Sequence, residues 1–156
     1  MAQHFQVLVV GGGNAGLSAA ALLLRRNARL SVGIIEPSTK HYYQPAWTLV
    51  GGGAFDICDT EREEKDYIPT GATWIKDRAA TFLPEENAVT LAQGERVTYD
   101  QLLVCPGIQL DWSAVKGLPE ALGRNGVTSN YSFQHAPYTW ELIKGLRKGR
   151  AIFHSP

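Results

Sequence analysis

Three glycines whose spacing can hold a phosphate stand near the start of the chain. Gly11, Gly13 and Gly16 follow the pattern G-x-G-x-x-G, directly after an apolar run over residues 7–10. In this pattern the first glycine permits a tight turn, the second lets the backbone approach a pyrophosphate, and the third lets a helix pack closely on the strand. Free N–H groups and the positive dipole end at the start of that helix would hold the phosphates. The spacing therefore predicts a dinucleotide site.

An acidic residue completes this motif. Glu36 ends a second apolar run over residues 30–35 and follows Gly16 by 20 residues. Its carboxylate can accept hydrogen bonds from ribose hydroxyls, and its charge would repel a 2′-phosphate. Because strand, glycine turn, helix and acid follow in order, a dinucleotide site is favoured over an ordinary glycine-rich turn in a βαβ unit.

The elements that must position these residues follow from hydropathy and from the turn residues. The helix after the glycines is expected over residues 15–27, and a short helix is expected over 46–50, after Pro45. The mixed charge run at residues 61–66 is interpreted as a solvated helix face or loop without function.

The pattern changes in the middle of the chain. Short β-rich runs separated by turns predict a small antiparallel meander inserted into the α/β unit, over residues 73–76, 79–83, 88–91 and 96–99. The apolar run 102–105 is typical of a strand buried on both faces of a parallel sheet. A last helix is expected over 137–147, and residues 151–153 begin another strand. The predicted fold class is α/β, a Rossmann-like parallel sheet with helices and an inserted antiparallel β-meander.

The composition argues against several classes of function. The 156 residues include 15 Lys plus Arg and 15 Asp plus Glu, so the net charge of zero gives no support for a nucleic-acid partner. Cys58 and Cys105 are too few for a disulfide framework, which favours a reducing compartment. The first strand begins too close to Met1 for a targeting peptide, and no apolar run is long enough to span a membrane. The histidines lack metal-ligand spacing, so no metal site is expected.

A second block of residues is more specific than the glycine motif. Residues 43–51 read Tyr-Gln-Pro-Ala-Trp-Thr-Leu-Val-Gly, and this block resembles the sulfide:quinone oxidoreductases. These enzymes belong to the flavin-dependent pyridine nucleotide–disulfide oxidoreductase superfamily, and the likeness is greatest to the type II branch, which includes the mitochondrial enzymes. Further matching stretches extend over almost the whole chain, at residues 74–76, 106–111, 116–119, 129–132 and 151–153.

The resemblance implies that the Rossmann-like fold binds FAD rather than NAD. By matched position, the residues at the pyrophosphate are Gly11, Gly13, Asn14, Ala15 and Gly16. At the adenosine end, the resemblance assigns the ribose to Glu36 and the adenine to the backbone of Ala79.

At the flavin end, the resemblance points to two further places. Gln44, with Pro45 beside it, is expected at the mouth of the flavin site, and Pro106 and Gly107 are expected to form the second turn that contacts the flavin.

The same resemblance places the redox chemistry outside these residues. The family passes sulfide sulfur through a persulfide on two redox-active cysteines, and the flavin transfers the electrons to a quinone in the membrane. Both cysteines, the quinone pocket and the membrane-contacting C-terminal part are expected beyond Pro156, so no catalytic residue is expected within the chain. Sulfide and quinone are the expected partners of the parent enzyme, which is expected to be cytoplasmic and peripheral to the membrane.

The chain is therefore interpreted as the N-terminal fragment of a longer enzyme. Residues 1–115 are expected to be the N-terminal part of the FAD-binding domain, residues 116–149 a connection and helix, and residues 150–156 the truncated start of a second dinucleotide-binding-like domain. The fragment alone is expected to be inactive and to hold FAD weakly or not at all. An unpaired strand edge at 151–153 predicts a homodimer or a domain swap.

Two other interpretations stay open. A type II NADH:quinone oxidoreductase shares the fold and the quinone chemistry, and would be favoured if the remaining part of the enzyme lacked both cysteines. A non-catalytic module that senses NAD or scaffolds a partner explains the glycine motif and Glu36 equally well, but not the matches at Gln44-Pro45 and Pro106-Gly107. Cys105, which ends an apolar run, is interpreted as a small buried hydrophobe rather than a redox group.

Overall fold

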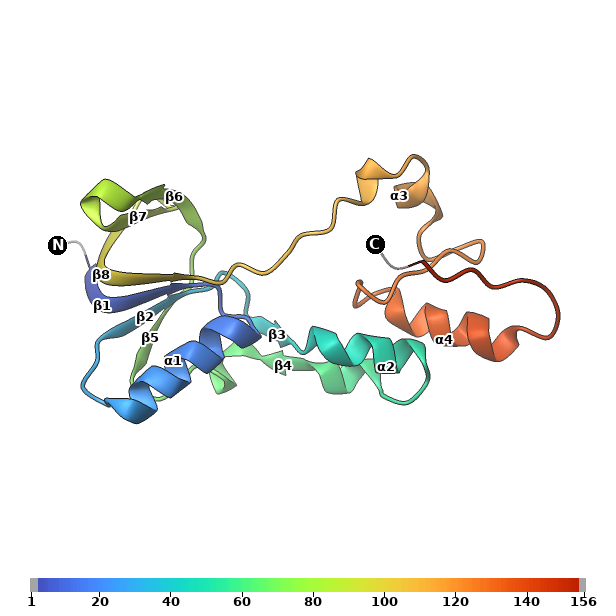
Figure 1. Ribbon diagram of the computed structural model, residues 1–156, viewed down its shortest axis with the longest axis horizontal. Coiled ribbons are helices and arrows are strands. Elements are labelled where there is room, and N and C mark those ends of the chain that lie inside the picture. Colours follow the sequence, from blue (N-terminus) through green and yellow to red (C-terminus); the bar gives the residue numbers. More distant parts are fainter. Residues whose placement is uncertain (1–2, 155–156) are drawn as a thin grey trace. The chain divides into compact units, whose positions relative to one another are not determined.

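The computed structural model describes residues 3–154, which form two compact units (Figure 1). The first unit comprises residues 3–42 and 61–109, and the second comprises residues 43–60 and 110–154. Residues 43–60 thus group with the C-terminal part of the chain rather than with the residues on either side of them. The predicted domains were continuous in sequence and did not include this arrangement. The predicted domain that starts at residue 150 stays a prediction, and residues 155–156 lie outside the described residues.

A six-stranded sheet forms the first unit, with strand order β5-β2-β1-β8-β7-β6. Four neighbouring strands are parallel, and they are β1 (Gln3–Val10), β2 (Val32–Ile35), β5 (Ala72–Ile75) and β8 (Arg96–Val104). Two antiparallel strands extend the sheet beyond β8, and they are β7 (Ala88–Leu91) and β6 (Ala79–Leu83). The mostly parallel sheet with added antiparallel strands confirms the predicted α/β class.

Two details of the predicted meander were wrong. The run expected to begin it forms β5, which pairs in parallel with β2 and belongs to the central sheet. The separate strands expected at 96–99 and 102–105 are one continuous strand, β8, which pairs with β1 along its length and with β7 only over Arg96–Thr98. Because β7 ends there, the last part of β8 is not buried on both faces, and Val104 is 53% exposed.

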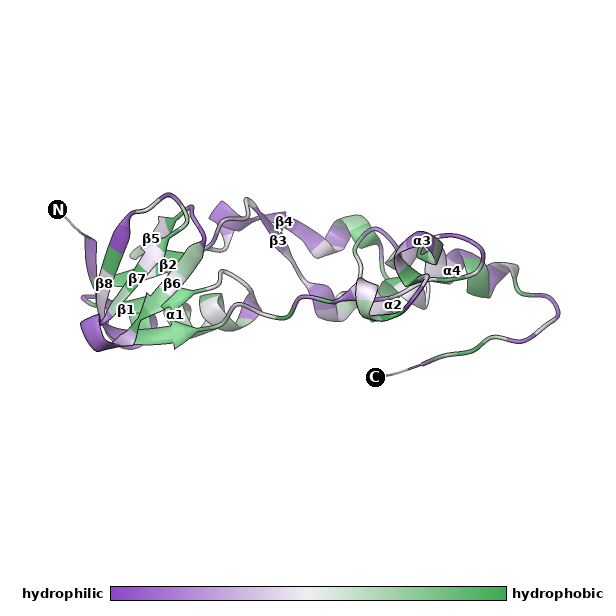
Figure 2. Ribbon diagram, turned by 90° about the horizontal axis from the view of Figure 1, so that it is seen from above, coloured by the Kyte–Doolittle hydropathy of each residue, from purple (hydrophilic) through white to green (hydrophobic). Residues whose placement is uncertain are grey.

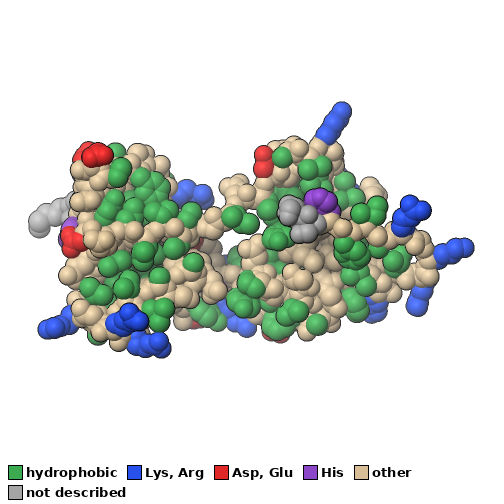
Figure 3. Space-filling model, in the orientation of Figure 1, with side chains coloured by type: hydrophobic (Ala, Val, Ile, Leu, Met, Phe, Trp, Pro, Cys, Tyr) green, Lys and Arg blue, Asp and Glu red, His purple; other side chains and the backbone are tan. Residues whose placement is uncertain are grey.

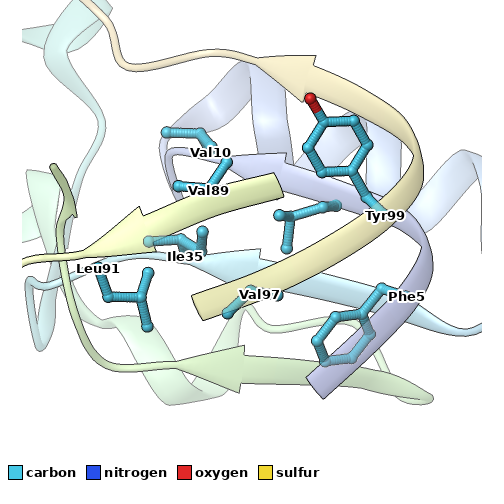
Figure 4. Close-up of a cluster of buried hydrophobic side chains, with 8 residues drawn as sticks. Phe5, Val10, Ile35, Val89, Leu91, Val97 and Tyr99 are labelled. Atoms are coloured by element: carbon cyan, nitrogen blue, oxygen red, sulfur yellow. The ribbon is translucent and has the colours of Figure 1, made fainter. Parts of the chain in front are cut away.

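Alternation along β1 divides the core of this unit between the two faces of the sheet. Val7 and Val9 pack on one face with apolar residues of helix α1 (Asn14–Arg26), including Leu17. The other face carries a second cluster around Leu8 and Val10 (Figure 4), completed by Phe5, Ile35, Val89, Leu91, Val97 and Tyr99. Since successive side chains of a strand point to opposite faces, the apolar run of β1 serves both layers. The sheet and α1 together hold the glycine turn between them.

A short antiparallel pair, β3 (Lys40–Tyr42) and β4 (Glu61–Glu63), closes the first unit where residues 43–60 leave and return. The strands of the main sheet are mostly hydrophobic, whereas β4 is hydrophilic (Figure 2). A single 3-10 turn, η3 (Glu64–Asp66), follows β4 directly. The charge run at 61–66 is therefore a strand and a turn rather than a loop or helix face.

The second unit consists of short helices. Its elements are the 3-10 turns η1 (Gln44–Ala46), η2 (Ile57–Thr60) and η5 (Trp112–Ala114), and the helices α2 (Trp47–Gly51), α3 (Leu118–Ala121) and α4 (Ala136–Gly145). Trp47, Val50 and Ala136 form its core, and the Trp47 indole N–H donates to the Thr60 hydroxyl over 3.0 Å. The predicted helices at 46–50 and 137–147 are confirmed, each displaced by one or two residues.

The expected strand at 151–153 is absent from the structure. Residues 151–154 have no regular structure, and Ile152 is 87% exposed. The open strand edge that predicted self-association is therefore not found there, since a ladder edge requires extended, paired backbone. Within residues 3–154, no helix has the length and apolar character needed to cross a bilayer.

Candidate dinucleotide-binding site

Two of the motif glycines are required by close packing. Gly11 follows β1 with φ at +106°, and a Cβ there would overlap the carbonyl group of Cys105. The Gly11 N–H donates to the carbonyl of Ile35 over 2.9 Å, which ties the turn to β2. A Cβ on Gly16 would overlap the carbonyl oxygen of Gly11, so the start of α1 could not approach the turn with any larger residue. Both glycines therefore act within the fold itself, as the motif predicts.

Gly13 differs from its neighbours because its side-chain face is open. A Cβ at Gly13 would meet no atom within 4 Å, and its backbone is extended with φ at −70°. Gly13 is the N-cap of α1, and no side chain caps this end of the helix. Asn14 and Ala15, the first residues of α1, are exposed. The first-turn N–H groups have no partner within the helix, so this end is available to an anion.

The Glu36 carboxylate lies beside the glycine turn and is held by two backbone groups. Its Oε2 accepts from the Gly12 N–H over 2.8 Å, and its Oε1 accepts from the Ser38 N–H over 2.7 Å. The indole N–H of Trp74 donates to the Glu36 carbonyl over 2.9 Å, which fixes the backbone of the residue. Each carboxylate oxygen retains a further lone pair, so Glu36 can still accept from a ligand hydroxyl.

Four of the predicted site residues line one cavity of about 290 Å³ in the first unit. They are Gly11, Glu36, Ala79 and Pro106. The turn after β1, the end of β2, the start of β6 and the end of β8 bring them together, which places the cavity at the carboxyl ends of parallel strands. Gly107 follows with φ at +72° but does not line this cavity.

Sequence reasoning did not select the four other residues that line this cavity, which are Val10, Ile35, Pro37 and Arg78. Pro37 and Arg78 stand directly beside Glu36 and Ala79 in the chain, and adjacency to those residues was the only signal that could have found them. The exposed guanidinium of Arg78 is the cation at the cavity. Arginine suits both stacking on a planar base and pairing with phosphate.

Gln44 and Pro45 belong to the second unit. There they line a separate cavity of about 250 Å³ with Thr48, Asn130 and Tyr131. The Oδ1 of Asn130 is buried and has no hydrogen-bond partner among the described residues. The place of Gln44 and Pro45 at a flavin stays a prediction.

The charge run contains a buried residue that sequence reasoning missed. Glu64 is 1% exposed, and its Oε2 lies 3.2 Å from Nδ1 of His41, which is 7% exposed. Burial raises the pKa of the Glu64 carboxyl, and the negative charge of Glu36 raises it further, while His41 opposes both. An alternating charge pattern cannot reveal one inward-facing acid, because the five neighbouring charged residues are at the surface or half-buried.

Other groups that could do chemistry are dispersed. Residues 3–154 hold no cluster of His, Cys, Asp or Glu that could bind a metal ion. Cys58 is exposed, and the half-buried Cys105 donates its N–H to the Val10 carbonyl over 2.7 Å at the glycine turn. On the face shown in Figure 3, Lys and Arg side chains form no continuous patch of the kind that nucleic acids require.

Comparison with known protein families identifies the family to which the chain belongs. Residues 5–139 match the model of the pyridine nucleotide-disulphide oxidoreductase family. The chain belongs to this family. Within the family, the glycine turn, Glu36 and the cavity between them occupy the segment that the model matches.

The relatives of this pyridine nucleotide-disulphide oxidoreductase include enzymes that oxidise sulfide. The chain is 52% identical over 153 residues to the mitochondrial sulfide:quinone oxidoreductase of Dictyostelium discoideum, covering 97% of this chain and 34% of that protein. It is 41% identical to the mitochondrial sulfide:quinone oxidoreductase of Mus musculus, covering 98% of this chain and 34% of the relative. The chain thus spans about a third of the length of these curated relatives.

A solved structure gives the same likeness. The sulfide:quinone oxidoreductase of the hyperthermophilic bacterium Aquifex aeolicus superposes with a TM-score of 0.66 at 25% identity, covering 92% of this chain and 32% of that one. The NADH:rubredoxin oxidoreductase of Clostridium acetobutylicum superposes with a TM-score of 0.55 at 20% identity, a likeness of fold alone.

Proposed function

We propose that these residues are the N-terminal, FAD-binding portion of a sulfide:quinone oxidoreductase, which oxidises sulfide to sulfane sulfur and passes the electrons to a quinone. The observation that carries the proposal is 52% identity to one such enzyme across 97% of the chain. A non-catalytic NAD-binding module would not require identity that continues through both units.

The residues present fit an adenine dinucleotide at the glycine turn. The open face of Gly13 leaves room for a pyrophosphate, and the uncapped start of α1 supplies N–H donors to it. Glu36 would accept from the ribose hydroxyls at the edge of the cavity, and Ala79 would offer its backbone to the adenine. When bound, FAD would supply a two-electron acceptor that returns electrons to a quinone.

At the flavin end, Gln44, Pro45, Pro106 and Gly107 are proposed to contact the flavin, as the resemblance implies. The two redox cysteines are proposed to lie outside these 156 residues, so the chain by itself is expected to be inactive and to hold FAD weakly or not at all. A peripheral contact with the membrane, where quinones dissolve, belongs to the same proposal.

A flavin spectrum of the full-length enzyme tests the proposed activity. We expect sulfide to bleach the flavin absorbance and a quinone to restore it, because the flavin sits between donor and acceptor. The measurement is anaerobic titration followed at the flavin band. Bleaching by NADH with no response to sulfide would instead identify an NADH:quinone oxidoreductase and contradict the proposal.

Removing the ribose-binding carboxylate should weaken FAD binding without abolishing it. We expect Glu36→Ala to lose about 1.5–3 kcal/mol of binding free energy, the value of charge-assisted hydrogen bonds to a ligand. Fluorescence titration of the full-length enzyme with FAD measures the change. Glu95→Ala removes an exposed carboxylate of the same unit and should bind as the unaltered chain does. Equal affinity in the two variants would show that Glu36 does not contact the ribose.

A further inference from the structure

The buried pair of His41 and Glu64 lies directly behind the glycine turn. His41 comes from β3 and Glu64 from the turn η3, and the ring of Tyr67 stacks on the His41 ring with centroids 5.0 Å apart. The Glu64 N–H donates to the Thr39 carbonyl over 2.9 Å, which anchors η3 to the residue that precedes β3. The other carboxylate oxygen of Glu64, Oε1, is buried and has no hydrogen-bond partner among the described residues. A buried carboxylate oxygen without a hydrogen-bond partner costs folding free energy, which points to a functional reason for its position.

That unpaired oxygen is aimed at the glycine turn. A Cβ placed on Gly12 would overlap Oε1 of Glu64 and also Cβ and Cγ of Glu36. Gly12 is thus flanked by two carboxyl-bearing side chains, one of them the ribose-binding candidate. The motif G-x-G-x-x-G allows any residue between its first two glycines. At Gly12 of this chain, however, only glycine fits.

Two acids this close cannot both be charged without a compensating proton. The Glu36 carboxylate accepts hydrogen bonds from the backbone N–H groups of Gly12 and Ser38. The groups that face Glu64 are Glu36 across Gly12 and His41 with its Tyr67 cover, while Lys40 pairs with Glu61 and Glu63 at the exposed edge of β3 and β4. One proton held between His41 and Glu64 makes that pair neutral. If the proton leaves to water, an uncompensated negative charge stands behind Glu36.

We propose that His41 and Glu64 are positioning residues that hold one proton behind Glu36, so that affinity for an adenine dinucleotide falls when the pair loses it. The inference rests on the proposed role of Glu36. The added charge would repel the Glu36 carboxylate from the Gly12 N–H and would oppose the phosphates of the ligand. Loss of affinity with rising pH is the expected sign, because deprotonation adds negative charge.

The test is the dissociation constant of FAD, and of ADP-ribose as a probe without flavin, for the full-length enzyme from about pH 5.5 to about pH 8.5, a range above the ordinary glutamate pKa, as the raised pKa of Glu64 requires. We expect the unaltered chain to lose about tenfold in affinity across this range, the factor that corresponds to one pKa unit of interaction. Glu64→Gln cannot carry the negative charge, so its affinity at the alkaline end of the range should stay near the acid-side affinity of the unaltered enzyme. Asp100→Asn, in the exposed pair of His4 with Asp100, is the matched control and should follow the unaltered profile.

Each outcome of this test is decisive. A flat profile for the unaltered chain, or the same pH dependence in Glu64→Gln, overturns the inference if Glu36→Ala still weakens binding. No binding of either probe at any pH overturns the dinucleotide site, and the inference with it. If Glu64→Gln does not fold, His41→Asn replaces it. Because the pair can hold its one proton on either residue, removal of His41 weakens the hold on that proton and should move the loss of affinity to lower pH, and an unmoved profile contradicts the proposal.

Stability supplies a readout that needs no ligand. Since the folded pKa of the Glu64 carboxyl is raised, the folded chain binds that proton more tightly than the unfolded chain does. The free energy of unfolding that this group contributes is therefore greatest below the unfolded pKa and declines as pH rises through the folded pKa. Glu64→Gln should lack that decline, and an unchanged decline would overturn the assignment of the proton to this pair.

Discussion

Gly13→Val should abolish dinucleotide binding while leaving the fold intact. The backbone of Gly13 is extended, with φ at −70°, and a Cβ there would meet no protein atom within 4 Å. The valine side chain would then occupy the space that a pyrophosphate needs at the start of α1. We expect at least a hundredfold loss of FAD affinity, equal to about 2.7 kcal/mol, with a change in unfolding free energy within about 0.5 kcal/mol.

The measurement pairs a titration of the full-length enzyme with FAD, followed by fluorescence, with a urea unfolding curve of the same sample. Gly13→Ala is the graded control, because its single methyl group reaches less far into the open space. Its affinity for FAD should lie between that of the unaltered enzyme and that of Gly13→Val. Wild-type affinity in Gly13→Val would refute the phosphate site. Loss of the folded state in that variant would show that the open face belongs to packing and not to a ligand.

Gly11→Val should instead unfold or severely destabilise the first unit. Gly11 has φ at +106°, which valine adopts only with strain, and its Cβ would overlap the carbonyl of Cys105 at the end of β8. Strain and backbone overlap together should cost about 3 kcal/mol or more of unfolding free energy. Chemical denaturation followed by circular dichroism measures this loss.

Gly94→Val separates the two causes of that loss. Gly94 has a similar φ of +90°, but a Cβ there would meet nothing within 4 Å. The strain alone should therefore cost about 1–3 kcal/mol at that position. Equal losses at Gly11 and Gly94 would mean that the contact with Cys105 contributes nothing to the requirement for glycine.

Local pattern predicted the parts of the site that local geometry builds. The glycine turn, α1 and Glu36 could be found because each occupies a fixed offset from its neighbour in a βαβ unit. The strand with which each strand pairs could not be predicted in the same way. β5 has the composition of a meander strand, and only its pairing with β2, about 40 residues earlier, makes it part of the parallel sheet.

Burial of a charged residue was also beyond local pattern. Glu64 looks like its neighbours in a hydrophilic run, and it is buried because η3 turns its side chain toward His41 and the glycine turn. Val104 shows the converse, since an apolar residue in a strand-like run is exposed where β8 lacks a neighbour in β7. In both cases the exposure of the side chain depends on contacts distant in sequence.

The β3–β4 pair has a consequence for how this chain can change its length. The backbone pairs Tyr42 with Glu61, and the Tyr43 N–H donates to the Thr60 carbonyl over 2.8 Å, so the ends of residues 43–60 are clasped together. A segment whose ends are clasped in this way imposes a closure entropy that grows only slowly with its length. For the six-stranded sheet, residues 43–60 are thus equivalent to a loop whose length can change at little cost in closure entropy, whereas the second unit needs Trp47 and Val50 of this segment for its core.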